Sequence, residues 1–168
     1  MVTAKKTPSW PEPDWAPVRP FPFAEARNVF GGLTSQKGLI VISYFRRPEG
    51  DVVATAEFGP MSEGAPGLVH GGAILTALDE ALGAAAWVAG FPSLTVHLET
   101  AFRKAVPLDA RLLAVTRVLS TRGRLAKVEG ELIDSEGTVY AKASGRFMRL
   151  DEASQKRIFG RAVQQKMR

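Results

Sequence analysis

The chain has 168 residues, of which 45% are hydrophobic, and its formal net charge at pH 7 is +5. This is the length of one ordinary domain, which can bury a core without the disulfides that the absence of cysteine excludes. The N-terminal segment lacks the apolar run of a signal peptide, and no apolar stretch is long enough to span a bilayer. We therefore expect a cytoplasmic protein without a membrane span. Its basic charge suits nucleic acid, a membrane surface or an anionic small molecule, and equally a solvated basic surface.

Residues 1–35 are predicted to form an arm that precedes the folded domain. Six prolines lie within the first 22 residues. Proline fixes φ and removes a backbone donor, so we expect an extended segment rather than a sheet strand or a helix. The aromatic residues Trp10, Trp15, Phe21 and Phe23 are expected to hold part of this arm against the body of the protein.

The rest of the chain predicts six strands and one long helix, in the order β-β-α-β-β-β-β. An alanine-rich apolar run predicts the helix, over about residues 71–89. The strands are expected over residues 39–47, 51–58, 93–106, 110–120, 124–134 and 138–150. A sheet that curls around the helix buries both most simply, so residues 36–150 are predicted to form an α+β domain. Residues 151–168 form a basic tail, expected to be a short helix or a frayed end.

Two adjacent acids, Asp79 and Glu80, lie inside the predicted helix among aliphatic neighbours. At 100° per residue, Asp79 falls about 140° from Ile74, at the edge of the apolar arc, whereas Glu80 falls at about 240°. We therefore expect Glu80 to be solvated or structural. Asp79 is the unusual acid, because desolvating a carboxylate is costly.

The sequence His70-Gly71-Gly72 comes directly before this apolar helix. We expect the N–H of Gly72 to be unpaired at the positive end of the helix dipole, where it can stabilise an oxyanion. Gly72 and Asp79 share a helix face but lie roughly 10 Å apart along its axis, too far to act on one carbonyl. The alternative is a tight turn and a hydrogen-bonded core acid with no catalytic role.

Two such helices related by a two-fold axis bring Gly72 of one subunit to Asp79 of the other. We therefore expect a homodimer with two equivalent sites, and a dimer of dimers as the larger assembly. The sequence leaves the choice between dimer and tetramer open.

The stretches PGLVHGGAILTALDEALG and YAKASGRFMRL, together with the order of elements, resemble hotdog-fold acyl-CoA thioesterases. The resemblance is to the phenylacetate-degradation-type branch of the 4-hydroxybenzoyl-CoA thioesterase superfamily, and within it to thioesterase superfamily members 4 and 5. It covers about residues 36–150 and implies a curved antiparallel sheet wrapped around one central helix. It also implies hydrolysis of an acyl-CoA thioester to a free acid and coenzyme A, with no cofactor besides the coenzyme A of the substrate.

The resemblance assigns roles to residues of this chain. It implies that His70 fixes the loop and assists substrate binding, and that the Gly72 amide polarises the thioester carbonyl. Asp79 is then the nucleophile or the base that activates water. Thr95, sixteen residues after Asp79, matches a Ser/Thr that orients the water or the carboxylate.

Two features put parts of this assignment in question. Many relatives carry an asparagine six residues before the histidine, where this chain has Gly64, so that contact is absent or supplied by Ser62 or Glu63. Strand alternation places Thr95 on the face opposite Leu94, pointing away from its own core if Leu94 faces the helix. Thr95 is then expected to reach a site across the dimer seam, or to be an ordinary strand threonine.

Gly71, Arg103 and Lys104 are expected to contact the substrate, with the two cations at the phosphates of coenzyme A. Solvated surface charge accounts for either cation equally well. Two histidines far apart in the chain and no cysteine predict that there is no metal site. We expect no nucleic-acid partner, and the glycines lack the Gly-Lys-Ser/Thr that follows in a phosphate loop.

Two other functions stay open. A hotdog hydratase or dehydratase needs a base aimed at carbon, and His70 is the only histidine near the helix. A non-catalytic acyl-CoA-binding protein is the second alternative. Sensors of this fold usually carry an added DNA-binding domain, which a proline-rich arm cannot form.

Overall fold

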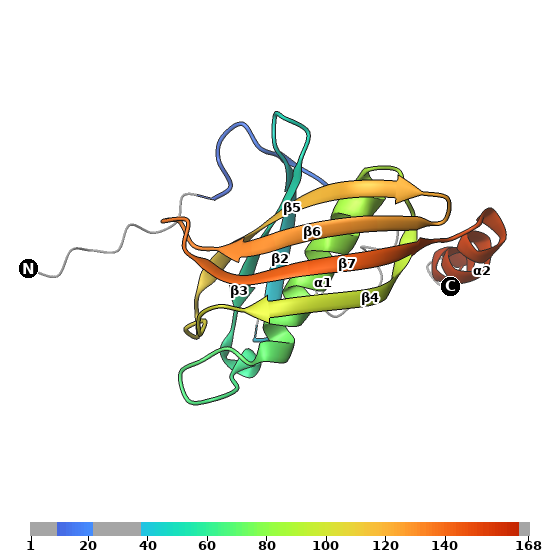
Figure 1. The fold of residues 1–168 in the computed structure, drawn as a ribbon. Helices are drawn as coiled ribbons and strands as arrows, with labels where there is room; N and C mark the ends of the chain where they lie inside the picture. The colour runs from blue at the N-terminus through green and yellow to red at the C-terminus, as the bar shows by residue number, and fades with distance from the viewer. Residues whose placement is uncertain (1–9, 22–37, 165–168) are drawn as a thin grey trace, which may run out of the picture.

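The computed structural model describes residues 10–21 and 38–164, and no helix within these ranges is long and apolar enough to cross a membrane. The strands are β1 (Ala16–Pro17), β2 (Ile40–Arg46), β3 (Val52–Phe58), β4 (Ser93–Phe102), β5 (Arg111–Arg122), β6 (Leu125–Ile133) and β7 (Val139–Arg149). The helices are α1 (Gly71–Val88), α2 (Glu152–Gln164) and the 3-10 turn η1 (Pro60–Ser62). All strands join one antiparallel sheet in the order β1-β2-β3-β5-β6-β7-β4, which curves around α1 (Figure 1).

The predicted α+β class, the order of elements and the wrapped sheet are confirmed. The tail forms a helix, α2, as one of the two expectations had it. The largest difference at a strand end is in β4, which ends at Phe102 rather than at residue 106. It ends there because the amides of Arg103 and Lys104 both donate to the carbonyl oxygen of Tyr140, which turns the chain out of the ladder.

Close packing of α1 on the sheet depends on small residues on both sides. The helix buries five alanines almost completely: Ala77, Ala81, Ala84, Ala85 and Ala86. Opposite them, Gly130 on β6 and Gly145 on β7 leave room for Leu82, since a Cβ on them would lie 3.0 and 3.5 Å from its methyl groups. These absent side chains let the sheet approach the helix closely enough to form one core.

The described part of the arm crosses from one face of the sheet to the other. Trp15 is buried on the outer face against Val53 and Leu113, with Trp10 packed beside them. Phe21 lies on the helix side, 6.0 Å between ring centroids from Tyr44. The expected anchoring is confirmed for Trp10, Trp15 and Phe21, whereas Phe23 lies outside the described ranges. The expectation that no part of the arm joins the sheet is wrong, because β1 pairs with β2. The predicted boundary at residues 35 and 36 lies outside the described ranges.

Strand β4 carries an irregularity that the sequence pattern does not reveal. Its register against β7 shifts between Thr95 and His97, where Val96 is an extra residue. A bulge of this kind reverses the alternation of side chains on either side of it. Thr95 pairs with the buried Phe147, so Thr95 faces α1, whereas His97 pairs with the exposed Arg146.

The packing at Gly130 gives a test of the fold. A Cβ there would also lie 3.0 Å from the carbonyl oxygen of Val115, which is backbone and yields little. We expect Gly130→Ala to lower the free energy of unfolding by about 1–3 kcal/mol, the usual cost of overpacking. The matched control is Gly160→Ala on α2, where a Cβ would meet nothing within 4 Å. This variant should keep or raise the free energy of unfolding, because alanine favours a helix more than glycine does. Denaturant unfolding measures both; equal stabilities would contradict the packing described.

Candidate active site

His70 fixes the start of α1. It is the N-cap residue, and its Nδ1 accepts a hydrogen bond from the N–H of Gly72 at 2.8 Å. Its own amide donates to the carbonyl oxygen of Ser62, which ties the preceding loop to the helix. A Cβ at Gly72 would lie 2.9 Å from that Nδ1. Glycine is therefore needed at position 72 for the histidine cap to form.

The hydrogen bond to His70 corrects one expectation about Gly72. Its N–H was expected to be unpaired, and it has an acceptor in this structure. The next donors along the helix, Ala73 and Ile74, both reach the carbonyl oxygen of His70. Within the described residues, Gly71 is the one position of this first turn whose N–H has no acceptor. Gly71 is thus the amide free to meet a ligand.

Gly64 faces His70 so closely that no side chain fits there. A Cβ at position 64 would lie 2.9 Å from the Cα of His70, so the asparagine of many relatives would force the histidine to move. The expected substitutes do not replace it. The Ser62 hydroxyl is buried and donates to the carbonyl oxygen of Gly59. Glu63 accepts a hydrogen bond from the amide of Gly67, so its carboxylate is held within its own loop.

Asp79 is half-buried on α1 and meets Thr95 of its own chain. The Thr95 hydroxyl donates to Oδ1 of Asp79 at 2.8 Å. Burial raises the pKa of Asp79 above 3.8, and the hydrogen bond from Thr95 opposes that rise. Thr95 was expected to point away from its own core only if Leu94 faced the helix. Leu94 faces outward instead, because the bulge at Val96 puts it on the other face from Leu98, so Thr95 points to α1. Thr95 therefore orients the carboxylate directly.

Glu80 points to the other flank of α1. Its Oε2 accepts a hydrogen bond of 2.9 Å from the hydroxyl of Tyr44, which is buried on β2. Burial raises the pKa of Glu80, the Tyr44 hydrogen bond lowers it, and the charge of Asp79 raises it further. Burial and the same carboxylate raise the pKa of Tyr44. Of the two expectations for Glu80, a solvated position is wrong and a structural one is confirmed.

A groove of about 650 Å³ opens at the N-terminal end of α1. It brings together four predicted site residues, namely His70, Gly71, Arg103 and Lys104. Apolar walls come from Leu68, Val69, Ile74, Phe102 and Val106. Gly72, Asp79 and Thr95 do not line it, so within a single chain the free amide of Gly71 lies far from the carboxyl group of Asp79. Their separation of eight positions along the helix corresponds to roughly 12 Å.

Phe102 is a site residue that sequence reasoning missed. Its ring is over half exposed, lines the groove, and lies 3.5 Å from where a Cβ of Gly71 would be. The signal was an aromatic residue directly before the two cations in the sequence AFRKAV. Nothing in the sequence links Tyr44 to Glu80, 36 residues away. Among the described residues, no group of three His, Asp or Glu side chains is arranged to hold a metal ion.

Comparison with known proteins agrees with this architecture. Residues 66–141 match the family model described as "Thioesterase superfamily". The chain is 31% identical over 129 residues to the acyl-coenzyme A thioesterase THEM5 of Mus musculus, covering 71% of this chain and 49% of that protein. It is 30% identical to the acyl-coenzyme A thioesterase THEM4 of Bos taurus, covering 76% and 53%. The chain thus spans about half the length of these curated relatives.

A solved structure shows the same fold. It is a hypothetical thioesterase protein from Streptococcus pneumoniae TIGR4 crystallised with coenzyme A, with a TM-score of 0.60 and 21% sequence identity. The superposition covers 65% of this chain and 85% of that one. The match over residues 66–141 and the similarity to these relatives show that the chain carries a thioesterase superfamily domain. The likeness to this solved structure, together with the sheet wrapped around α1, shows the hotdog fold.

Proposed function

We propose that this protein is an acyl-CoA thioesterase, in which water cleaves the thioester to give a free acid and coenzyme A. The observation that carries the proposal is Asp79, a half-buried acid with a raised pKa that Thr95 holds in one orientation. The similarity to curated acyl-CoA thioesterases supports it. The coenzyme A bound by the Streptococcus pneumoniae neighbour supports the choice of leaving group.

In the proposed reaction the Gly71 amide polarises the thioester carbonyl, and Asp79 is the nucleophile or the base that activates water. A carboxylate with a raised pKa is a better base at neutral pH than an ordinary one. Thr95 aligns this carboxylate, and His70 holds the turn that presents the Gly71 amide. The proposed reaction needs no cofactor and no metal ion. A cytoplasmic location is part of the proposal, since a chain without cysteine needs no oxidising compartment.

The separation between Gly71 and Asp79 supports a homodimer with shared sites. Strand β4 is one edge of the sheet, and Leu94, Val96 and Phe102 on it are each over half exposed. At the other edge, β1 and the arm cover β2. An open edge with exposed apolar side chains favours pairing with another chain, so we propose that two copies join through β4. The proposal extends to a dimer of dimers.

Arg103 and Lys104 are proposed to meet the phosphates of coenzyme A. Both are exposed at the rim of the groove that contains His70 and Gly71. Their amides are fixed by the carbonyl oxygen of Tyr140, which points this end of β4 at the groove. A phosphate needs such cationic partners.

The geometry of His70 disfavours the hydratase alternative. Because its Nδ1 accepts from Gly72, the proton of the neutral ring lies on Nε2, and that nitrogen cannot then act as a base. Incubation with a panel of acyl-CoA esters and a thiol reagent separates the functions. Released thiol identifies a hydrolase and a shifted double bond a hydratase. Thermal stabilisation without turnover identifies a binding protein.

Asp79→Asn is the decisive variant for the chemistry. We expect kcat for thiol release to fall by about 10²–10⁴, the usual contribution of a positioned acid or base. Glu80→Gln is the matched control on the next residue, and should retain activity because the amide oxygen can still accept from Tyr44. Loss of activity in the control alone would move the reaction to the other flank of the helix.

The same variant has a second readout in stability. Since burial raises the pKa of Asp79, the folded state favours the protonated form and loses stability as the pH rises through that pKa. Asp79→Asn should therefore raise Tm at pH 7, and the gain should vanish below pH 3.8. At Asp134 burial opposes ionisation, but the amides of Thr138 and Glu136 outweigh it and lower the pKa. Asp134→Asn should accordingly lower Tm at pH 7. Changes of the same sign would contradict the assignment.

Shared sites predict complementation between two inactive variants. Gly71→Pro removes the free amide hydrogen at a helix position that tolerates proline, after a residue already extended at φ −61° and ψ 137°. Mixing it with Asp79→Asn after reversible unfolding should return about a quarter of wild-type activity, since half the dimers are mixed and each has one intact site. Gly72→Pro is the control. If Gly72→Pro rather than Gly71→Pro is inactive and restores activity when mixed with Asp79→Asn, the amide that polarises the carbonyl is that of Gly72. Proven heterodimers without activity would exclude shared sites.

The coenzyme site predicts a change in KM alone. Lys104→Ala should raise KM about fivefold, as expected for one exposed charge contact of about 1 kcal/mol, and leave kcat unchanged. The dependence of KM on salt should also flatten. Lys142→Ala removes an exposed cation from the outer face of the sheet and is the matched control. An unchanged KM in Lys104→Ala and Arg103→Ala would remove both residues from the site.

A further inference from the structure

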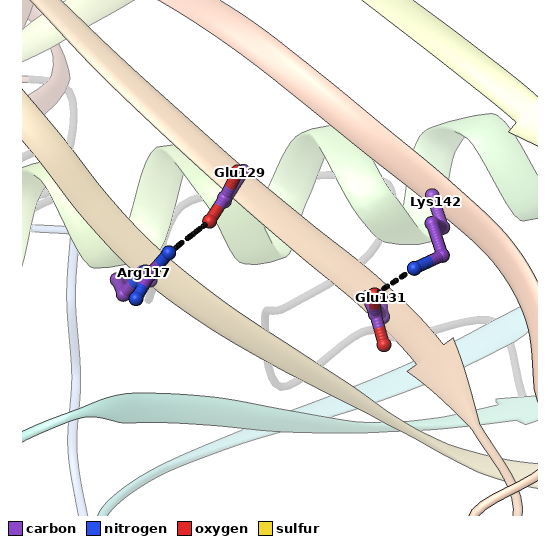
Figure 2. A network of polar contacts seen from close by, with 4 residues as sticks. All are labelled: Arg117, Glu129, Glu131 and Lys142. Atoms are coloured by element: carbon purple, nitrogen blue, oxygen red, sulfur yellow. Dashed lines mark hydrogen bonds and ion pairs between the residues drawn. The ribbon is translucent and has the colours of Figure 1, made fainter.

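The outer face of the sheet divides into two halves with different charge. On one half, an Arg117 nitrogen lies 2.7 Å from Oε1 of Glu129, and Lys142 pairs with Glu131, as Figure 2 shows. These pairs join β5 to β6 and β6 to β7, and they line a hollow of about 350 Å³ with Asp51. On this half both cations therefore have an acidic partner.

The other half carries basic side chains that have no acidic partner among the described residues. The register places His97 of β4, Arg146 of β7 and Lys127 of β6 side by side in one row. All three side chains are exposed, and none forms an ion pair within the part of the chain that the structure describes. Like charges directly opposite each other on neighbouring strands are destabilising. Arg146 and Lys127 therefore repel each other in the isolated protein.

An apolar row lies directly beside these cations. Leu94 of β4, Met148 of β7 and Leu125 of β6 pair in register, and Arg122 of β5 follows Leu125. Leu94 is 51% exposed and Leu125 is 41% exposed. We call the two rows the basic-apolar face, made of His97, Arg146, Lys127, Leu94, Met148, Leu125 and Arg122.

Two of the acids around the basic-apolar face are engaged in ion pairs. Glu129 is bound to Arg117, and Asp151 lies 3.9 Å from Arg124. Glu99 of β4 lies in the next row, opposite Ser144. The helix α2 follows at the same end of the sheet and carries exposed Lys156 and Arg157 as well as exposed Glu152 (Figure 1). The surroundings therefore leave the positive charge of this face in place.

We propose that the basic-apolar face docks onto an anionic lipid surface. Exposed leucines beside lysine and arginine are the composition that binds the boundary between lipid headgroups and acyl chains. Anionic headgroups would remove the repulsion between Arg146 and Lys127. A second copy of the chain fits less well, because the charged side chains of both faces would be basic and would repel each other. A soluble polyanion would leave the leucines exposed.

This surface is separate from the groove at Gly71 and does not depend on the proposed reaction. If two chains join through β4, the basic-apolar faces lie on one continuous sheet and double the contact. Pairing of β4 through its main chain leaves Leu94 on the outer face.

Vesicle co-sedimentation with the full chain tests the proposal. Binding should occur to phosphatidylcholine vesicles that contain phosphatidylglycerol, weaken with salt, and be absent with phosphatidylcholine alone. Lys127→Glu should reduce the partition coefficient about 30-fold, since each charge near the surface contributes about 1 kcal/mol and the reversal changes two. Lys142→Glu changes the net charge equally, from +5 to +3, and should alter binding less than about threefold.

Two further measurements keep the test sharp. Lys127→Glu places a carboxylate opposite Arg146, so its Tm should equal or exceed that of the wild type, which excludes unfolding as the cause of lost binding. Leu125→Ser should weaken the binding that persists at high salt. Equal binding to both vesicle types, or equal losses in both lysine variants, overturns the proposal. Binding to heparin that Leu125→Ser does not change would overturn it in favour of a soluble polyanion. An oligomer that dissociates in the Lys127→Glu variant would overturn it in favour of a second copy of the chain.

Discussion

The burial of a carboxyl group beside an alanine-rich helix is the constraint around which this domain is built. Asp79 is half-buried, and burial raises its pKa, so its charged form is costly. The cost is limited by one hydrogen bond, from Thr95 on β4. That bond exists only because Val96 interrupts the pairing of β4 with β7 and turns Thr95 toward α1. One extra residue in an edge strand therefore determines how the acid is held.

His70 connects the loop, the helix and the groove in a similar way. It caps α1 through its ring and ties the loop to the helix through its amide. Glycine at positions 64 and 72 makes room for this ring, since a Cβ at either position would lie 2.9 Å from His70. The departure from the asparagine of many relatives is thus coupled to the histidine. Restoring an asparagine at position 64 would displace the cap that leaves the Gly71 amide free.

The parts of the structure that follow local patterns were predictable from the sequence. Hydrophobic periodicity and glycine turns placed all six long strands and α1, because these patterns act within short stretches of chain. The sequence also identified Asp79 as the unusual acid, since its place on the helix follows from residue spacing. The bulge at Val96 was not predictable, because it depends on how β4 fits β7 rather than on its own residues. Strand alternation correctly placed Thr95 opposite Leu94, but without the bulge it could not show which of the two faces α1.

The partners of side chains were harder to predict than their positions. Helical phase placed Glu80 away from the apolar arc, but Tyr44 of a distant strand reaches it and makes it structural. The same phase placed Gly72 on the face of Asp79, but the acceptor of its amide is His70, two residues earlier. Both errors arise because a helical wheel shows directions and omits the chain that packs on them. A sequence pattern can indicate where a polar group lies before it can indicate what satisfies it.

The C-terminal end of α1 is covered by other segments and its N-terminal end is open, and this difference restricts how substrate can reach the helix. At its C-terminal end, Trp87 packs against Phe21 of the arm at 5.8 Å and against Phe159 of α2 at 5.4 Å between ring centroids. Its indole N–H also donates to the carbonyl oxygen of Ser93. Segments from both ends of the chain thus cover this part of the helix, whereas the N-terminal end opens into the groove at Gly71. In the proposed reaction, the thioester therefore approaches α1 from its capped end, where the free amide and the cationic rim lie.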